Sequence, residues 1–70
     1  MRIYGLEVSP EQEAAVMERM KSPFTFRDLR KVWTTVGFPY DTSATEQIIR
    51  RENAAGRIVR RGTEWHPKEK

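Results

Sequence analysis

The clearest hydrophobic pattern lies in the middle of the chain, where four apolar residues recur at i, i+3, i+4 and i+7: Leu29, Val32, Trp33 and Val36. This spacing places them on one face of an α-helix. Thr25 precedes the stripe as an N-cap, and Asp28 follows three residues later, as in a capping box. Gly37 ends the pattern, because glycine readily takes the left-handed conformation that follows a helix. The pattern therefore predicts a helix between Thr25 and Gly37, with Trp33 in the core.

A second helical pattern begins at Ser9, which is a good N-cap and is followed by Pro10 at the first helical position. Gln12 completes a capping box. A modest apolar face follows, formed by Ala14, Val16, Met17 and Met20. Pro23 ends this helix, because the residue before a proline is pushed out of the helical conformation. Residues 1–8 show no clean period and are expected to form a short strand or an arm packed on the core.

A third helix is predicted from Thr42 or Ser43 to about Ala55, and Ser43 and Glu46 form a further capping box. Gly56 suits a left-handed cap at its end. Four residues are expected to face the core: Ala44, Ile48, Ile49 and Ala55. The polar remainder then faces outward: Thr45, Gln47, Arg50, Arg51 and Asn53.

The C-terminal segment has the pattern of a β-hairpin. Apolar residues stand on both sides of Gly62-Thr63: Ile58, Val59 and Trp65. Two short strands around this pair are predicted. Phe24 is interpreted as a strand of one or two residues ahead of the middle helix, and residues 67–70 are expected to form a frayed tail. A chain of 70 residues has room for a single domain, 1–70.

Charge is unevenly distributed along the chain, although the net charge is only +3. Residues 1–42 carry six basic and six acidic side chains, whereas residues 43–70 carry seven basic and four acidic ones. The positive excess therefore coincides with the third helix, the hairpin and the tail. Such asymmetry favours a nucleic-acid or membrane-surface partner. The plain alternative is a solvated surface with a basic tail.

Composition disfavours several classes of protein. The chain has no cysteine, which excludes disulfides and thiolate metal sites. No apolar run approaches the roughly 18 to 20 residues that span a bilayer, and the N-terminus lacks the apolar stretch of a signal peptide. We therefore expect a soluble cytoplasmic protein without a membrane partner. The single histidine, His66, lies near the tail, so we expect neither an enzyme nor a bound cofactor, metal or small-molecule substrate.

The order of the predicted elements resembles a winged helix-turn-helix domain over residues 9–66. The resemblance is carried by 24–29, which lead from a strand into the middle helix, by the polar-faced third helix, and by 56–62, which lead from a glycine into the hairpin. It implies an α+β, mainly α fold of three helices and a C-terminal β-hairpin wing, to which the short strand pairs. Two features depart from the family pattern. The corner 37–41 is longer than usual, and Glu52 stands where relatives place an apolar core residue.

In winged helix-turn-helix domains the third helix enters the major groove of DNA, with its N-terminal half against base edges. The resemblance therefore implies DNA contacts by four residues of the third helix: Thr45, Gln47, Arg50 and Arg51. It also implies phosphate or minor-groove contacts by three residues of the wing: Arg57, Arg60 and Arg61. Successive strand residues point to opposite faces, and we expect Arg61, next to the turn glycine, to meet the phosphate. A plainer role for the wing charges is to block an exposed strand edge.

These inferences predict a small transcriptional regulator that binds double-stranded DNA. A homodimer is possible, and residues 1–8 and the first helix are its candidate surfaces. The main alternative is a protein–protein interaction module, because fold does not fix function. It gains weight if nearby acids neutralise the arginines: Glu46, Glu52 and Glu64. A third hypothesis, a single-strand or RNA binder, requires Trp65 and Tyr40 to be exposed together. An exposed pair of Phe38 and Tyr40 would instead indicate a protein interface.

Overall fold

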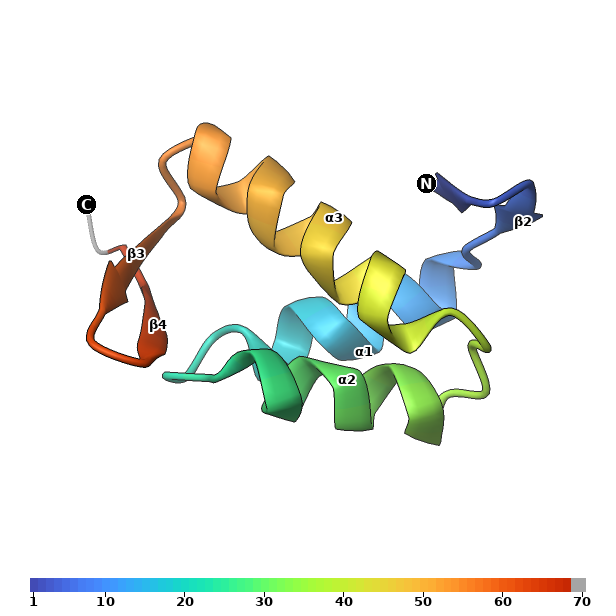
Figure 1. The fold of residues 1–70 in the computed structure, drawn as a ribbon, viewed down its shortest axis with the longest axis horizontal. Coiled ribbons are helices and arrows are strands. Elements are labelled where there is room, and N and C mark those ends of the chain that lie inside the picture. The colour runs from blue at the N-terminus through green and yellow to red at the C-terminus, as the bar shows by residue number, and fades with distance from the viewer. Residues whose placement is uncertain (69–70) are drawn as a thin grey trace.

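In the computed structural model, which describes residues 1–68, three helices precede a two-stranded antiparallel hairpin (Figure 1). The helices are α1 (Pro10–Arg19), α2 (Phe26–Thr35) and α3 (Asp41–Ala54), and the strands are β1 (Arg2–Ile3), β2 (Leu6–Glu7), β3 (Ile58–Arg61) and β4 (Glu64–Pro67). The two hairpins, β1–β2 and β3–β4, lie at opposite ends of the molecule. This α+β, mainly helical arrangement confirms the fold class expected from the sequence, and it has the layout of a winged helix-turn-helix.

Side-chain caps start the first two helices, as the sequence predicts. The Ser9 hydroxyl accepts a hydrogen bond from the backbone N–H of Gln12 at 3.1 Å, and the Gln12 side chain accepts one from the N–H of Ser9 at 3.0 Å. Thr25 and Asp28 make the same reciprocal pair at 3.2 and 2.9 Å. Each box satisfies N–H groups that a helix start otherwise leaves without partners.

The start of α3 differs from the predicted one. α3 begins at Asp41, and its N-cap residue, Tyr40, makes no capping hydrogen bond through its side chain. The predicted capping box of Ser43 and Glu46 is wrong, because the Ser43 hydroxyl donates to the Tyr4 hydroxyl at 3.1 Å instead. The first turn of α3 is therefore held by the N-terminal hairpin.

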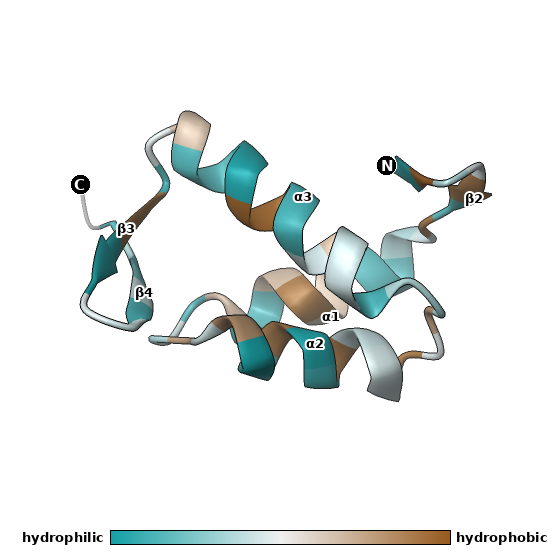
Figure 2. Cartoon of the chain, in the orientation of Figure 1, coloured by the Kyte–Doolittle hydropathy of each residue, from teal (hydrophilic) through white to brown (hydrophobic). Residues whose placement is uncertain are grey.

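The core lies where the three helices meet, and its apolar side chains also come from both hairpins and the connectors: Ile3, Val8, Val16, Met20, Phe24, Leu29, Trp33, Phe38, Ala44, Ile48, Ile49 and Ile58. Apolar stretches of the helices face the middle of the molecule in Figure 2. Trp33 is fully buried, as predicted, and its ring centroid lies 5.2 Å from that of Phe38. Phe38 is therefore a core residue, and the exposed pair of Phe38 and Tyr40 considered from the sequence does not form.

The C-terminal hairpin has the predicted turn. Arg61 pairs with Glu64 in antiparallel register, which leaves Gly62-Thr63 as a two-residue loop with φ of +63° at the glycine. Phe24 forms an antiparallel bridge with Trp65, and the two residues exchange backbone hydrogen bonds of 2.9 and 2.7 Å. The expected short strand ahead of α2 is thus a single bridging residue that docks on the hairpin.

The first two residues of the predicted tail belong to the C-terminal hairpin instead. Pro67 pairs with Ile58 at the end of β4, and the N–H of Lys68 donates to the carbonyl of Arg57 at 2.9 Å. Residues 67 and 68 therefore extend the hairpin, and the rest of the predicted tail, 69 and 70, lies outside the described residues. Within residues 1–68, no helix is both long and apolar enough to cross a bilayer.

Candidate nucleic-acid interface

The outer face of α3 presents a stripe of small and polar side chains. The stripe follows the helical spacing i, i+4, i+7 and i+11, which places its members on one side of the helix: Ser43, Gln47, Arg50 and Ala54. Gln47 and Arg50 are exposed. Within residues 1–68, the Arg50 guanidinium has no carboxylate within 4.0 Å. This stripe is one exposed part of α3 that a large partner can reach.

Thr45, which was predicted to contact DNA, lies on the opposite side of α3. Its side chain is fully buried, and its hydroxyl donates to the carbonyl of Asp41 at 2.7 Å. This bond to the preceding turn satisfies the hydroxyl without solvent, so a threonine is tolerated in the core. The outward position predicted for Thr45 is therefore wrong, as is the core position predicted for Ala55, which is exposed.

An open cleft lies between α3, the start of α2 and the C-terminal hairpin. Its lining residues come from all three elements: Phe26, Glu46, Ile49, Arg50, Asn53, Arg60, Thr63 and Trp65. Arg50 and Arg60 thus reach the same cleft from different elements. Among residues 1–68, Arg60 also has no carboxylate within 4.0 Å, and its Nε donates to the carbonyl of Gly62 at 3.1 Å. Both guanidinium groups are available to an anion such as phosphate.

Arg60 and Arg61 belong to opposite faces of β3, as the alternation of a strand requires. Arg61 is exposed and lines a different depression, together with Asn53, His66 and Lys68. The wing arginine that joins Arg50 in the cleft is therefore Arg60, whereas Arg61 was the expected phosphate contact.

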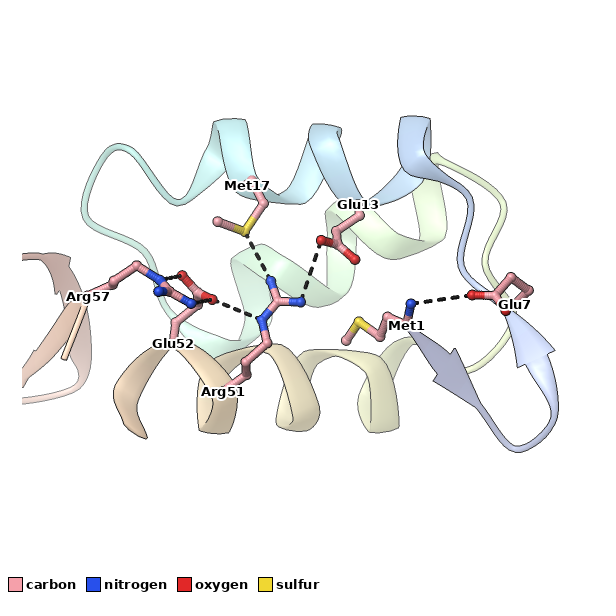
Figure 3. A network of polar contacts seen from close by, with 7 residues as sticks. All are labelled: Met1, Glu7, Glu13, Met17, Arg51, Glu52 and Arg57. Atoms are coloured by element: carbon pink, nitrogen blue, oxygen red, sulfur yellow. Dashed lines mark hydrogen bonds and ion pairs between the residues drawn. The ribbon is translucent and has the colours of Figure 1, made fainter. Parts of the chain in front are cut away.

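Two further predicted DNA contacts, Arg51 and Arg57, are held by the buried carboxylate of Glu52 (Figure 3). The Glu52 residue is only 2% exposed. Arg57 donates to both carboxylate oxygens, from Nε at 2.7 Å and from Nη2 at 2.9 Å, and Arg51 donates from Nε at 2.9 Å. Arg51 also reaches Glu13 on α1 at 3.5 Å. These two arginines therefore connect α1, α3 and the hairpin.

The charge of Glu52 is stabilised by its partners. Hydrogen bonds from Arg57 lower the pKa of Glu52 below its ordinary value, and Arg51 lowers it further, whereas burial opposes both. Glu52 is consequently ionised at neutral pH, and its single negative charge is shared by two arginines and offsets one of their two positive charges. The basic character of the α3 and hairpin surface therefore rests on Arg50, Arg60 and Arg61.

The glycine cap of α3 explains why Glu52 and Arg57 meet. Gly56 has φ of +74°, its N–H donates to the carbonyl of Asn53 at 3.0 Å, and the N–H of Arg57 donates to the carbonyl of Glu52 at 3.0 Å. These two bonds define a Schellman motif, which brings the residue after the glycine beside the residue five positions earlier. The sequence analysis did not predict this pair. The signal for it was a glutamate five positions before an arginine that directly follows the glycine at the end of the helix.

Cations without acidic partners also lie on α2, where the charge count along the sequence shows no excess. Arg27 and Lys31 are exposed, and neither has a carboxylate within 4.0 Å in the described part of the chain, whereas Arg30 pairs with Asp41 at 3.3 Å. The acids of the first half of the chain lie mostly on β2 and α1: Glu7, Glu11, Glu13 and Glu18. The even balance of residues 1–42 therefore combines a basic α2 with an acidic α1.

The aromatic residues required for single-strand binding do not form one surface. Tyr40 stands at the start of α3, whereas Trp65 lies in the hairpin beyond its end and is partly buried against the core. Residues 1–68 also contain no group of three or more His, Asp or Glu side chains that could hold a metal ion. The features that the fold does bring together are the outer stripe of α3 and the cleft beside it.

The chemistry of this interface suits a nucleic acid, which carries anionic phosphates and base edges with hydrogen-bonding groups. Arg50 and Arg60 supply charge-assisted donors for phosphate or for guanine, and the Gln47 amide can pair with adenine. A helix of this width fits the major groove of duplex DNA. Comparisons with protein families, curated proteins and solved structures find no match to this chain.

Proposed function

We propose that this chain is a winged helix-turn-helix domain that binds duplex DNA and acts as a small transcriptional regulator in the cytoplasm. The observation that carries the proposal is the cleft beside α3, which Arg50 and Arg60 line from a helix and a hairpin without acidic partners in residues 1–68. Two arginines that line one cleft from different elements are suited to a phosphate at the edge of a groove.

The proposed contacts divide between base edges and backbone. Gln47 and Arg50, on the outer stripe of α3, face the bases, because a recognition helix reads them with its exposed side. Arg60 binds phosphate from the cleft, and Arg61 binds it from the other face of the hairpin. Arg51 and Arg57 contribute indirectly by fixing the hairpin to α3 through Glu52.

A titration of labelled mixed-sequence duplex with the protein at two salt concentrations tests the proposal. We expect binding that weakens steeply with salt, because phosphate contacts release counterions. Arg50→Ala and Arg60→Ala should each weaken binding about tenfold, the scale of a lost charge-assisted hydrogen bond. Fluorescence anisotropy of the duplex measures both effects.

Arg61→Ala is the matched control, since it removes the same charge from the adjacent residue but on the other face of β3. We expect it to weaken binding less than Arg60→Ala. Equal losses would contradict the preference for the cleft over the other face of the hairpin. Absence of binding at low salt, or binding that salt does not alter, would remove DNA as the ligand.

A protein-interaction module is the second candidate, and the locking of Arg51 and Arg57 by Glu52 favours it. In that case the partner would be an acidic protein, and its carboxylates would bind Arg50 and Arg60 in place of DNA. The same titration separates the two functions, because an interaction module gives no salt-dependent binding of DNA.

A further inference from the structure

The N-terminal hairpin has an unusual residue at its tip. The register of β1 and β2 leaves Tyr4 and Gly5 as its two-residue loop, and both have positive φ, 50° and 80°. A type I′ turn requires this conformation at both positions and favours Asn-Gly there. A tyrosine with positive φ is strained, since its Cβ crowds the backbone. The turn alone therefore gives no reason for a tyrosine at position 4.

The Tyr4 side chain lies on the start of α3. Its ring packs edge-on against Tyr40, with centroids 5.2 Å apart, and its hydroxyl accepts a hydrogen bond from Ser43 at 3.1 Å. The residue nevertheless remains 77% exposed. The fold thus fixes the position of the phenol and leaves most of it open to a partner.

Ser43 is the first member of the outer stripe that continues through Gln47 and Arg50. Because the Tyr4 hydroxyl is bound to Ser43, it extends this stripe beyond the N-terminal end of α3. The β1–β2 hairpin lies at that end of the helix, and β3–β4 lies at the other (Figure 1). A duplex that receives the outer stripe of α3 would therefore meet Tyr4 as well as Arg50.

We propose that Tyr4 is a DNA-contacting residue and that its hydroxyl donates to a backbone phosphate at the N-terminal end of α3. This inference rests on the function proposed above. The phenolic oxygen accepts from Ser43, which leaves its own proton free to donate, and tyrosine is a frequent donor to phosphate oxygens. The N-terminal hairpin then flanks the reading helix on one side and the wing flanks it on the other.

Two substitutions isolate the role of Tyr4. Tyr4→Phe keeps the ring and removes the hydroxyl together with the hydrogen bond that it accepts from Ser43. Tyr4→Asn removes the ring but suits the turn, because asparagine tolerates positive φ and Asn-Gly is favoured in type I′ turns. Both variants should therefore fold, and urea unfolding followed by circular dichroism checks this.

The experiment titrates labelled duplex with the wild type, Tyr4→Phe, Tyr4→Asn and Arg50→Ala under one low-salt condition. We expect Tyr4→Phe to weaken binding about threefold, as for one neutral hydrogen bond, and Tyr4→Asn to weaken it further. Sedimentation of each free protein at the same concentrations shows whether its mass is unchanged.

The outcomes separate this inference from the proposed function. If Arg50→Ala weakens binding while both Tyr4 variants bind as tightly as the wild type, or more tightly, Tyr4 makes no DNA contact and only this inference is overturned. If the Tyr4 variants change the mass of the free protein instead, the tyrosine serves a second copy, and the inference also fails. If the wild type binds no duplex, the proposed function itself is lost. If Tyr4→Asn does not fold, Tyr4→Phe alone decides.

Discussion

At the scale of single residues, Glu52 shows how a charged side chain can take a core position. The stripe of α3 that faces α1 and α2 ends with this carboxylate at 2% exposure. Arg57 and Arg51 donate three hydrogen bonds to it, so its oxygens do not lose their partners on burial. Both arginines keep much of their side chains in solvent, which lowers the cost of the pair.

We expect Glu52→Gln to lower the free energy of unfolding at pH 7 by about 1 to 2 kcal/mol. This estimate takes charge-assisted hydrogen bonds and discounts them for the exposure of the arginines. Urea denaturation measures the loss. Glu46→Gln is the control on the same helix, since Glu46 is exposed and has no basic partner within 4.0 Å in residues 1–68. An equal loss in both variants would contradict the role assigned to Glu52.

The same pair gives a pH dependence with a defined sign. The pKa of Glu52 is lowered by folding, chiefly through hydrogen bonds from Arg57. Its stabilisation is therefore fully present above the pKa of the unfolded chain, near 4.5, and is lost as pH falls through the lower pKa of the folded protein. The difference in stability between the wild type and Glu52→Gln should shrink over this acidic range, and a constant difference would rule the mechanism out.

At the scale of elements, α2 and α3 both end with a Schellman motif, but the side chains that meet across the motif differ in chemistry. At the end of α2, Gly37 has φ of +79°, and the N–H of Phe38 donates to the carbonyl of Trp33 at 2.9 Å, beneath a contact of the two rings. At the end of α3, the corresponding pair is Arg57 and Glu52. One helix therefore ends on an apolar contact in the core, and the other ends on an ion pair that orients the hairpin.

We expect Gly56→Ala to lower the free energy of unfolding by roughly 1 kcal/mol, because an L-residue is strained at positive φ. A Cβ at this position meets nothing within 4 Å, so the loss would be conformational rather than steric. Gly56→Asn should cost less, since asparagine tolerates this conformation. Thermal and urea unfolding compare the three proteins, and equal stability of the alanine variant and the wild type would refute the assignment of the cap.

The elements that could be predicted from the sequence are those whose signals are local. Ser9 and Thr25 cap α1 and α2 through residues three positions away, and Gly62 marks the hairpin turn by its own conformation. The start of α3 could not be predicted in this way, because the Ser43 hydroxyl donates a hydrogen bond to Tyr4, which lies 39 residues earlier in the sequence. Pairings between distant segments leave no local pattern to read.

The candidate interface could be predicted only in part, for a related reason. Gln47, Arg50, Arg60 and Arg61 are exposed, as expected from their polarity. The polarity of Thr45 led to the prediction that it faces outward. Its hydroxyl instead donates to the carbonyl of Asp41, one turn earlier, which satisfies the hydroxyl in the core, and this bond exists only in the folded helix. Hydropathy also could not show that Glu52 pairs with both Arg51 and Arg57, because the pair with Arg57 depends on the capping geometry at the end of α3.

At the scale of the whole molecule, acidic and basic surfaces lie on different helices. α1 carries exposed acids at Glu11 and Glu18, whereas α2, α3 and the C-terminal hairpin carry the cations without acidic partners among residues 1–68. A groove between the N-terminal hairpin and α1 has apolar lining from Met1, Ala14 and Met17 and acidic lining from Glu7 and Glu13. We propose that a second copy docks at this groove, so that two α3 helices can reach two half-sites of one duplex.

We expect the mass of the free protein to rise with concentration in sedimentation equilibrium, and Ala14→Glu to abolish the rise by placing a charge in the groove. Ala55→Glu is the matched control, because Ala55 is also exposed but lies at the end of α3. A wild type that stays monomeric at the concentrations of the DNA titration would contradict the dimer.

The bridge between Phe24 and Trp65 has a consequence for how the chain is made. The connector between the first two helices finds its backbone partner only in the last strand. During synthesis the three helices leave the ribosome before the hairpin. The backbone hydrogen bonds between Phe24 and Trp65 can form only after Trp65 has been made. The docking of this connector on the wing can therefore form only after Trp65 has left the ribosome, so completion of the wing is a late step in folding.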